Sequence, residues 1–262
     1  MILVKAKGVI IKVTWVIILL IILYSVQHLV NFLSYDYRGP SSSLVKVFSV
    51  IGIEGNIARF ILWDLFQVAI TIIGCKLLIK KTLKELGFNL HNLKSGVRYI
   101  CTFLLIFPLI QAIAWFIIYK WMGMDALTGG VSNESIVYAI QDILVYGLLP
   151  GVGEEPLFRV FVIQFLLLTA FKEQDLSDRS TMVWVVLISA ICFSYGHIYI
   201  VSWSPFTVTY SAIQLLTAFV LGIFYAVTYI RTKSILTAVV CHNYSDFINR
   251  LGNYILFYLL LA

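Results

Sequence analysis

Long apolar runs, separated by short polar segments, dominate the pattern of this chain. A helix needs roughly 20 apolar residues to cross a bilayer, and seven stretches come close to that length. They fall near residues 13–33, 60–79, 99–119, 152–171, 182–199, 207–230 and 234–249. Residues 252–262 are also apolar but are too few for a further span. The pattern predicts an all-α fold, a polytopic transmembrane bundle of about seven to eight helices.

One segment interrupts this regular series. Residues 133–150 are partly polar, contain Asp142 and run into Pro150-Gly151. Because Pro and Gly interrupt helices, we predict an interfacial or re-entrant helix here, or the first half of a broken one. We therefore divide a single membrane domain into N-terminal transmembrane helices, 1–130, and a helical core, 131–262.

The basic residues indicate an orientation. Most of the 19 Lys and Arg residues fall on segments that are cytoplasmic if the N-terminus is inside, and loop 80–98 is the most basic stretch. Cytoplasmic loops are enriched in Lys and Arg, so the bias predicts a cytoplasmic N-terminus. The net charge of +6 is thus explained by topology and by contact with membrane lipid. It does not indicate a nucleic-acid partner.

Composition agrees with a membrane location. Hydrophobic residues make up 61% of the chain and charged residues only 12%, and mean hydropathy is +0.95. A soluble domain carries about 25% charged residues. The four cysteines lie within apolar runs at no metal-ligand spacing, so we interpret them as small hydrophobic residues without a disulfide framework.

Against this background, the segment GVGEEPLFR at 151–159 is unusual. A charge deep in a bilayer costs about 2.5–3.5 kcal/mol on insertion scales, so charged residues there usually have a function. Glu155 and Arg159 are four residues apart and can pair on one helical face. Glu154 points elsewhere and is left available as a general base. The structural alternative is a salt-bridged, broken helix that only holds the fold together.

Two further apolar segments carry imidazoles. CFSYGHIY contains Phe193 and His197, and CHNYSDF places His242 and Asp246 four residues apart, facing the same space on a helix. A single histidine in an apolar helix is more often a core residue than a ligand. With the N-terminus inside, however, Glu154, His197 and Asp246 all fall near the outer ends of their spans. The three elements are therefore predicted to converge at one depth.

The three motifs together resemble those of a known family. EEPLFR, FSYGH and HNYSD are similar to the EExxxR, FxxxH and HxxxN/D motifs of the CPBP membrane proteins, which comprise type II CAAX prenyl proteases and bacteriocin-processing, or Abi, proteins. The resemblance covers roughly residues 133–250. Asp246 stands where many members carry Asn, and the family pattern admits both. The core at 131–262 is thus expected to be a CPBP/Abi-like catalytic core.

The resemblance implies an intramembrane endopeptidase that acts on a membrane-associated peptide or protein. Glu154 would activate water and His197 would assist it. His242 and Asp246 would polarise the scissile carbonyl or hold the oxyanion, and Glu155 with Arg159 would complete the site electrostatically. This assignment agrees with the general chemistry of carboxylate bases and imidazole donors.

The sequence leaves the cofactor open. Glu154, His197 and His242, with Asp246 nearby, are a plausible ligand set for a divalent metal such as zinc, although no HExxH motif is present. The family has been described both as metalloproteases and as glutamate proteases. The favoured interpretation is a glutamate mechanism with no cofactor.

Two other functions remain possible on the same residues. The first is a non-proteolytic factor on the same fold, in bacteriocin self-immunity or regulation. The second is a proton- or cation-coupled transporter, but transporters usually show paired broken helices and repeats, and only one broken segment is seen. The short chain favours an integral protein of a bacterial plasma membrane.

Overall fold

The computed structural model describes residues 2–36, 40–53, 55–128, 131, 135–172 and 174–260. The predicted domain boundary at 130 and 131 therefore falls partly outside the described residues, as does residue 133, the predicted start of the polar segment. The elements are α1 (Ile2–Tyr35), α2 (Ser41–Val50), α3 (Gly55–Gly74), η1 (Cys75–Ile79), α4 (Leu93–Met122), α5 (Asp125–Thr128), α6 (Ile136–Leu148), α7 (Pro150–Glu155), η2 (Pro156–Phe161), α8 (Val162–Leu168), α9 (Arg179–Tyr195), β1 (Tyr199–Trp203), β2 (Phe206–Thr209), α10 (Ala212–Thr232) and α11 (Leu236–Leu260).

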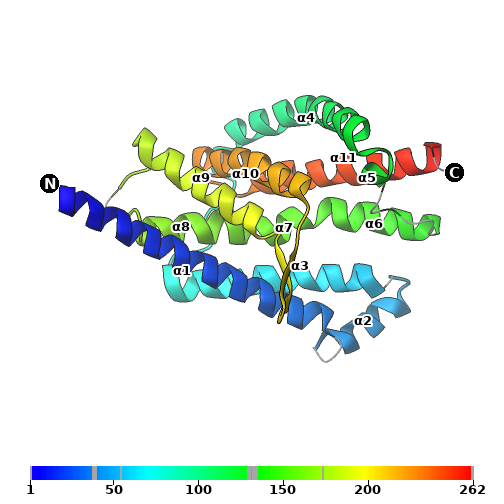
Figure 1. The fold of residues 1–262 in the computed structure, drawn as a ribbon, viewed down its shortest axis with the longest axis horizontal. Coiled ribbons are helices and arrows are strands. Elements are labelled where there is room, and N and C mark those ends of the chain that lie inside the picture. Colours follow the sequence, from blue (N-terminus) through cyan, green and yellow to red (C-terminus); the bar gives the residue numbers. More distant parts are fainter. Residues whose placement is uncertain are drawn as a thin grey trace.

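The helices form an elongated bundle, and most of their axes lie along one direction (Figure 1). The predicted all-α membrane bundle is confirmed. In the described part of the chain, five helical segments are long and apolar enough to cross a membrane: Gly8–Tyr35, Gly55–Ile79, Leu93–Met122, Ile136–Leu168 and Ala212–Thr232. The outer face of α4 is strongly apolar, with Leu105 and Leu109 exposed by 76% and 67%. A soluble protein rarely exposes such a face, whereas lipid stabilises it.

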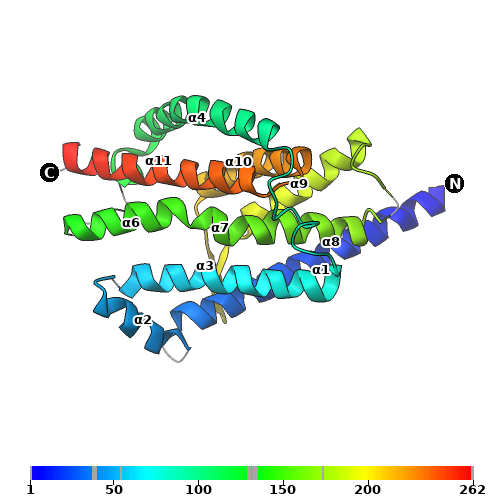
Figure 2. The same ribbon diagram turned by 180° about the vertical axis from the view of Figure 1, so that it is seen from behind.

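Of the alternatives predicted for residues 133–150, the structure shows the first half of an interrupted helix, and the prediction of a separate span beginning near residue 152 is wrong. α6, α7, η2 and α8 follow one another as a single apolar rod, Ile136–Leu168, and Leu149 alone separates α6 from α7. Figure 2 shows this rod side by side with α3. As a result, Glu154 lies near the middle of a 33-residue rod and not near its outer end.

The interruption at Pro150 is small because α11 supplies a hydrogen-bond acceptor there. Pro150 has no backbone N–H and cannot continue the hydrogen bonding of α6. The next backbone amide, that of Gly151, donates to Oδ1 of Asn243 on α11 at 2.8 Å. The backbone N–H groups of Gly151, Val152 and Gly153 are therefore all bonded where the rod passes Pro150.

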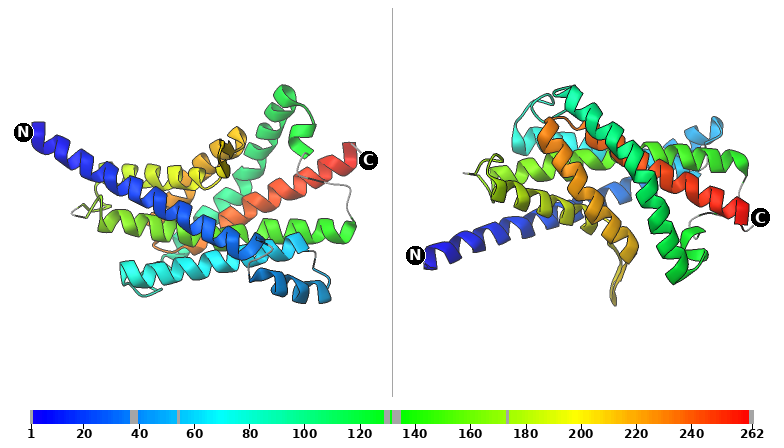
Figure 3. Two further views of the ribbon diagram at one scale, coloured as in Figure 1. Left: turned by 60° about the horizontal axis from the view of Figure 1, so that its bottom comes forward. Right: turned by 90° about the horizontal axis from the view of Figure 1, so that it is seen from above.

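The predicted span 182–199 extends too far at its C-terminal end, and the predicted span 207–230 begins too early. α9 ends at Tyr195, and residues 199–209 form an antiparallel hairpin of β1 and β2 that projects from the middle of the bundle (Figure 3). Hydropathy alone does not distinguish this β-branched and aromatic stretch from helix. At the C-terminus, the apolar tail at 252–262 is not separate, because α11 continues to Leu260.

Candidate active site

A buried ion pair lies at the centre of the site. Arg159, on η2, donates from Nε to Oε2 of Glu155 at 2.9 Å and from a terminal nitrogen to Oε1 at 3.2 Å, and both side chains are fully buried. The guanidinium also contacts Ser189 Oγ of α9 at 3.3 Å and lies 4.4 Å from the ring centre of Phe193. The i, i+4 pair expected from the sequence is thus present, and it joins η2 to α9.

His242 on α11 connects this pair to the other acids. Its Nδ1 lies 2.8 Å from Oε1 of Glu155. Its Nε2 lies 3.3 Å from Oδ2 of Asp246 and 3.9 Å from Oε2 of Glu154. A carboxylate only accepts hydrogen bonds, so the contact with Glu155 places a proton on Nδ1. The second nitrogen is thereby turned toward Glu154 and Asp246.

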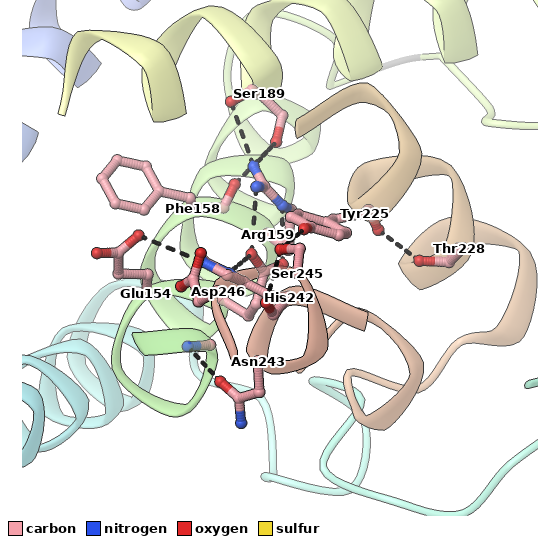
Figure 4. A network of polar contacts seen from close by, with 12 residues as sticks. Glu154, Phe158, Arg159, Ser189, Tyr225, Thr228, His242, Asn243, Ser245 and Asp246 are labelled. Atoms are coloured by element: carbon pink, nitrogen blue, oxygen red, sulfur yellow. Dashed lines mark hydrogen bonds and ion pairs between the residues drawn. The ribbon is translucent and has the colours of Figure 1, made fainter. Parts of the chain in front are cut away.

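Aromatic contacts fix the plane of the His242 ring. Tyr225 of α10 stacks on it with ring centres 5.1 Å apart, and Phe193 of α9 approaches edge-on at 5.5 Å. The Tyr225 hydroxyl bonds Ser245 Oγ at 2.8 Å, and Ser245 in turn donates to the His242 carbonyl. Figure 4 shows Tyr225, His242 and Ser245 close to Arg159. α9, α10, α11 and the rod all contribute to the imidazole's orientation.

Glu154 has a different environment from Glu155. Its side chain is 12% exposed, and one of its carboxylate oxygens lies 3.9 Å from Nε2 of His242. It lines two cavities of about 480 and 570 Å³, which share Phe60, His197 and Tyr199 as lining residues. Glu154 therefore has access to both cavities, while Glu155 is enclosed by Arg159 and His242.

His197 is not on a helix, contrary to the prediction. It lies in the turn after α9, where its backbone N–H donates to the Ser194 carbonyl at 3.1 Å, and its ring still contacts Phe193 with centres 5.3 Å apart. Nε2 of Gln214, on α10, lies 3.2 Å from Nδ1 of His197. An amide nitrogen only donates, so Nδ1 accepts and the neutral ring carries its proton on Nε2.

Besides Ser189, Tyr225 and Ser245, sequence reasoning missed two further contributors to the site. The first is Gln214, which gives no signal by spacing. The second is α1, whose residues Tyr24, Gln27, His28 and Asn31 line the smaller cavity. Gln27 donates to the Gly196 carbonyl at 3.1 Å, next to His197. Their i, i+3, i+4, i+7 spacing within the first apolar run is a signal that could have identified this face.

The predicted metal ligands Glu154, His197 and His242 stay a prediction. Among the residues that the structure describes, no three His, Cys, Asp or Glu side chains form a group that could hold a metal ion. Both ring nitrogens of His242 already have a carboxylate partner, since Nδ1 is bonded to Glu155 and Nε2 faces Asp246. As they are arranged here, these described side chains do not form a site for a resident metal.

The fold and the site together define a helical membrane protein in which two glutamates, an arginine and a histidine form a largely buried cluster with a partly exposed aspartate beside it. Residues 136–248 match the family model described as type II CAAX prenyl endopeptidase Rce1-like. The predicted resemblance is therefore confirmed over that region of the chain. Comparison with curated proteins and with solved structures gave no match.

Proposed function

We propose that this protein is an intramembrane endopeptidase in which Glu154 activates the attacking water. One observation carries the proposal: Glu154 is the glutamate of the pair that is free of Arg159, and it stands where two cavities meet. A carboxylate in that position can take a proton from a water molecule held beside it. The Rce1-like domain supports a protease at the level of the family.

The proposed reaction needs one water and the side chains of the site. Glu154 removes a proton from water while the oxygen attacks the scissile carbonyl carbon. The tetrahedral intermediate then collapses, the C–N bond breaks and Glu154 returns the proton to the leaving amine. The products are a carboxylic acid and an amine. Arg159 fixes the Glu155 carboxylate, which in turn orients the His242 ring. Neither side chain is chemically changed by the reaction.

His197 is proposed to stabilise the negative charge on the carbonyl oxygen. Because Gln214 donates to its Nδ1, Nε2–H of the neutral ring is available as a donor. A preorganised donor aimed at a developing oxyanion is among the largest catalytic contributions that proteins make. Asp246, which is 36% exposed at the side chain, would orient His242 from the opposite side to Glu155.

The two cavities suggest how a substrate lies in the site. Because both border Glu154, an extended peptide passing from one to the other would bring a single peptide bond to this carboxylate. The substrate class is a membrane-associated peptide or protein. A location in a bacterial plasma membrane with the N-terminus in the cytoplasm is part of the proposal, supported by the distribution of Lys and Arg.

The decisive experiment compares Glu154→Gln with the wild type in liposomes. A panel of lipid-anchored peptides, prenylated and unmodified, is incubated in H₂¹⁸O and the products are read by mass spectrometry. We expect the wild type to place one ¹⁸O in each new carboxylate and the variant to lose about 10³-fold in rate. Glu85→Gln, at an exposed loop glutamate bonded to Thr82, is the control and should keep full activity.

Two results would contradict the assignment. Full cleavage by Glu154→Gln would remove this residue from catalysis. If the wild type cleaves nothing in the panel, and Glu154→Gln still protects cells against a peptide bacteriocin, the non-proteolytic immunity function replaces the protease.

A further inference from the structure

α3 carries three buried polar side chains that neither the predicted motifs nor the proposed mechanism uses. Asp64, Gln67 and Thr71 are 3%, 0% and 3% exposed. Both carboxylate oxygens of Asp64, both polar atoms of Gln67 and the hydroxyl of Thr71 have no hydrogen-bond partner among the described residues. Nearly all buried polar groups in proteins are bonded to protein or to ordered water, so five such atoms together need an explanation.

These residues lie on one face of the helix, because positions 64, 67 and 71 follow an i, i+3, i+7 pattern. That face packs along the rod. A side chain at Gly153 would overlap Asp64, and one at Gly74 would lie 3.9 Å from the Phe161 ring. α3 and the rod therefore run in the same direction, and the three polar residues follow the rod from α7 into η2.

The end of this row at Asp64 reaches the candidate active site. The absence of a side chain at Gly153 lets the Asp64 carboxylate lie against the backbone immediately before Glu154. Asp64 is close enough to interact electrostatically with Glu154, His242 and Asp246. It approaches Glu154 from the α3 side and lines neither of the two cavities.

We propose that Asp64, Gln67 and Thr71 bind a file of internal water molecules that ends beside Glu154. Each water in a protein interior needs two to four polar partners, and the carboxylate, amide and hydroxyl offer both donors and acceptors along the row. Packing against apolar neighbours alone would leave all five atoms unsatisfied, which is costly in a protein interior.

The second part of the inference rests on the proposed function. A peptide that fills both cavities displaces the water they contain, yet every hydrolysis consumes one water at Glu154. The α3 face is a third approach that the substrate does not block. Asp64 is thus a positioning residue, which holds the water next to the general base, and Gln67 and Thr71 replenish it.

The water file is tested first without activity. Hydroxyl-radical footprinting of the reconstituted full-length protein, with short X-ray pulses in H₂¹⁸O, oxidises side chains next to bound internal water. We expect ¹⁸O at Leu157 or Phe161 of η2, both buried, in the wild type. Gln67→Leu and Thr71→Val should lower that label at least about threefold, because each removes partners of the waters. An unlabelled wild type, or labelling unchanged in both variants, would overturn the water file.

The kinetic role is tested with the same variants. We expect Gln67→Leu and Thr71→Val to lower kcat about tenfold with KM within twofold, since substrate binding is not affected. Asp64→Leu should be nearly inactive, and Asp64→Asn, which keeps the shape and the polar atoms, should recover most of the rate. Thr232→Val makes the same chemical change at a buried threonine bonded to the Thr228 and Ser234 carbonyls, and it should leave kcat unchanged.

Melting curves of all variants separate this role from a structural one. Variants that unfold earlier but keep wild-type kcat would show that the row is only structural, and the supply of water by α3 would be refuted. Labelling that behaves as expected in a protein that cleaves no peptide would uphold the water file and reject the protease, so the two proposals fail separately.

Discussion

Glu154 and Glu155 are adjacent in sequence, yet their side chains have opposite surroundings. Glu155 is enclosed by two cationic or hydrogen-bonding partners, Arg159 and His242. Glu154 faces the cavities, and its ion-pair contact with Nε2 of His242 is long, at 3.9 Å. On a helix, adjacent side chains point about 100° apart, so neighbours can serve one structural and one chemical purpose.

The first prediction at this scale concerns Arg159. Arg159→Met should destabilise the protein by about 3–5 kcal/mol, because it leaves the buried Glu155 carboxylate without its main partner. The change is measured by reversible unfolding in mixed micelles. The double variant Glu155→Gln, Arg159→Met removes the isolated charge and should recover a large part of that loss.

Glu154→Gln is the matched control for this measurement. Glu154 forms no ion pair with Arg159 in the described structure. The unfolding free energy of the Glu154→Gln variant should therefore stay close to that of the wild type. A single Arg159→Met variant as stable as the wild type would contradict the role of the ion pair.

At the scale of elements, the rod α6–α7–η2–α8 positions the chemistry. Pro156 cannot donate to the carbonyl of the preceding turn, and the helix widens to the π form over Pro156–Phe161. Single π turns within α-helices occur frequently at functional sites. Here the π turn carries Arg159 to both Glu155 and Ser189.

A second prediction tests the hydrogen bond between Gly151 of the rod and Asn243 of α11. Asn243→Ala removes the acceptor of the Gly151 N–H and should cost about 1–3 kcal/mol, since a buried donor is left unpaired. It should also lower the rate of cleavage, because Glu154 and His242 lie on the two elements that this bond connects. Unfolding free energy and cleavage rate are measured on the same preparation.

The control is Asn249→Ala, at an asparagine of α11 whose side chain bonds Gln111 and is not buried. A surface substitution of this kind should change stability by less than about 0.5 kcal/mol. If Asn243→Ala changes the unfolding free energy equally little, the packing of the rod against α11 does not depend on this hydrogen bond.

At the scale of the whole molecule, the connection of helices decides which face each loop occupies. α4 is 30 residues long and separates the loop before Leu93 from the short helix α5. With the N-terminus inside, the two ends of α4 lie on opposite sides of the membrane.

Cysteine labelling tests that arrangement. Lys94→Cys and Asp125→Cys are made in a Cys101→Ser background, because Cys101 is exposed and the other three cysteines are buried. A membrane-impermeant maleimide should label position 125 in intact cells and position 94 only after permeabilisation. The reverse result would place the N-terminus outside, and labelling of both from one side would remove α4 as a crossing.

The predictable part of the fold is what depends on local pattern. The apolar runs gave the helical membrane class, and the i, i+4 spacing gave the Glu155–Arg159 and His242–Asp246 contacts. The hairpin at 199–209 and the continuity of the rod were not predictable in this way. The first has the hydropathy of a helix, and the second depends on Asn243, which is 92 residues away from Gly151.

The sequence by itself determined that this is a membrane protein and that the acids and imidazoles of the three motifs lie within apolar segments, because hydropathy and helical spacing are properties of neighbours along the chain. Only the tertiary structure decided that Glu154 meets two cavities, that Gln214 fixes the tautomer of His197 and that Asp64 lies beside Gly153. These are contacts between separate helices. Their geometry follows from how the helices pack, and no local pattern encodes that packing.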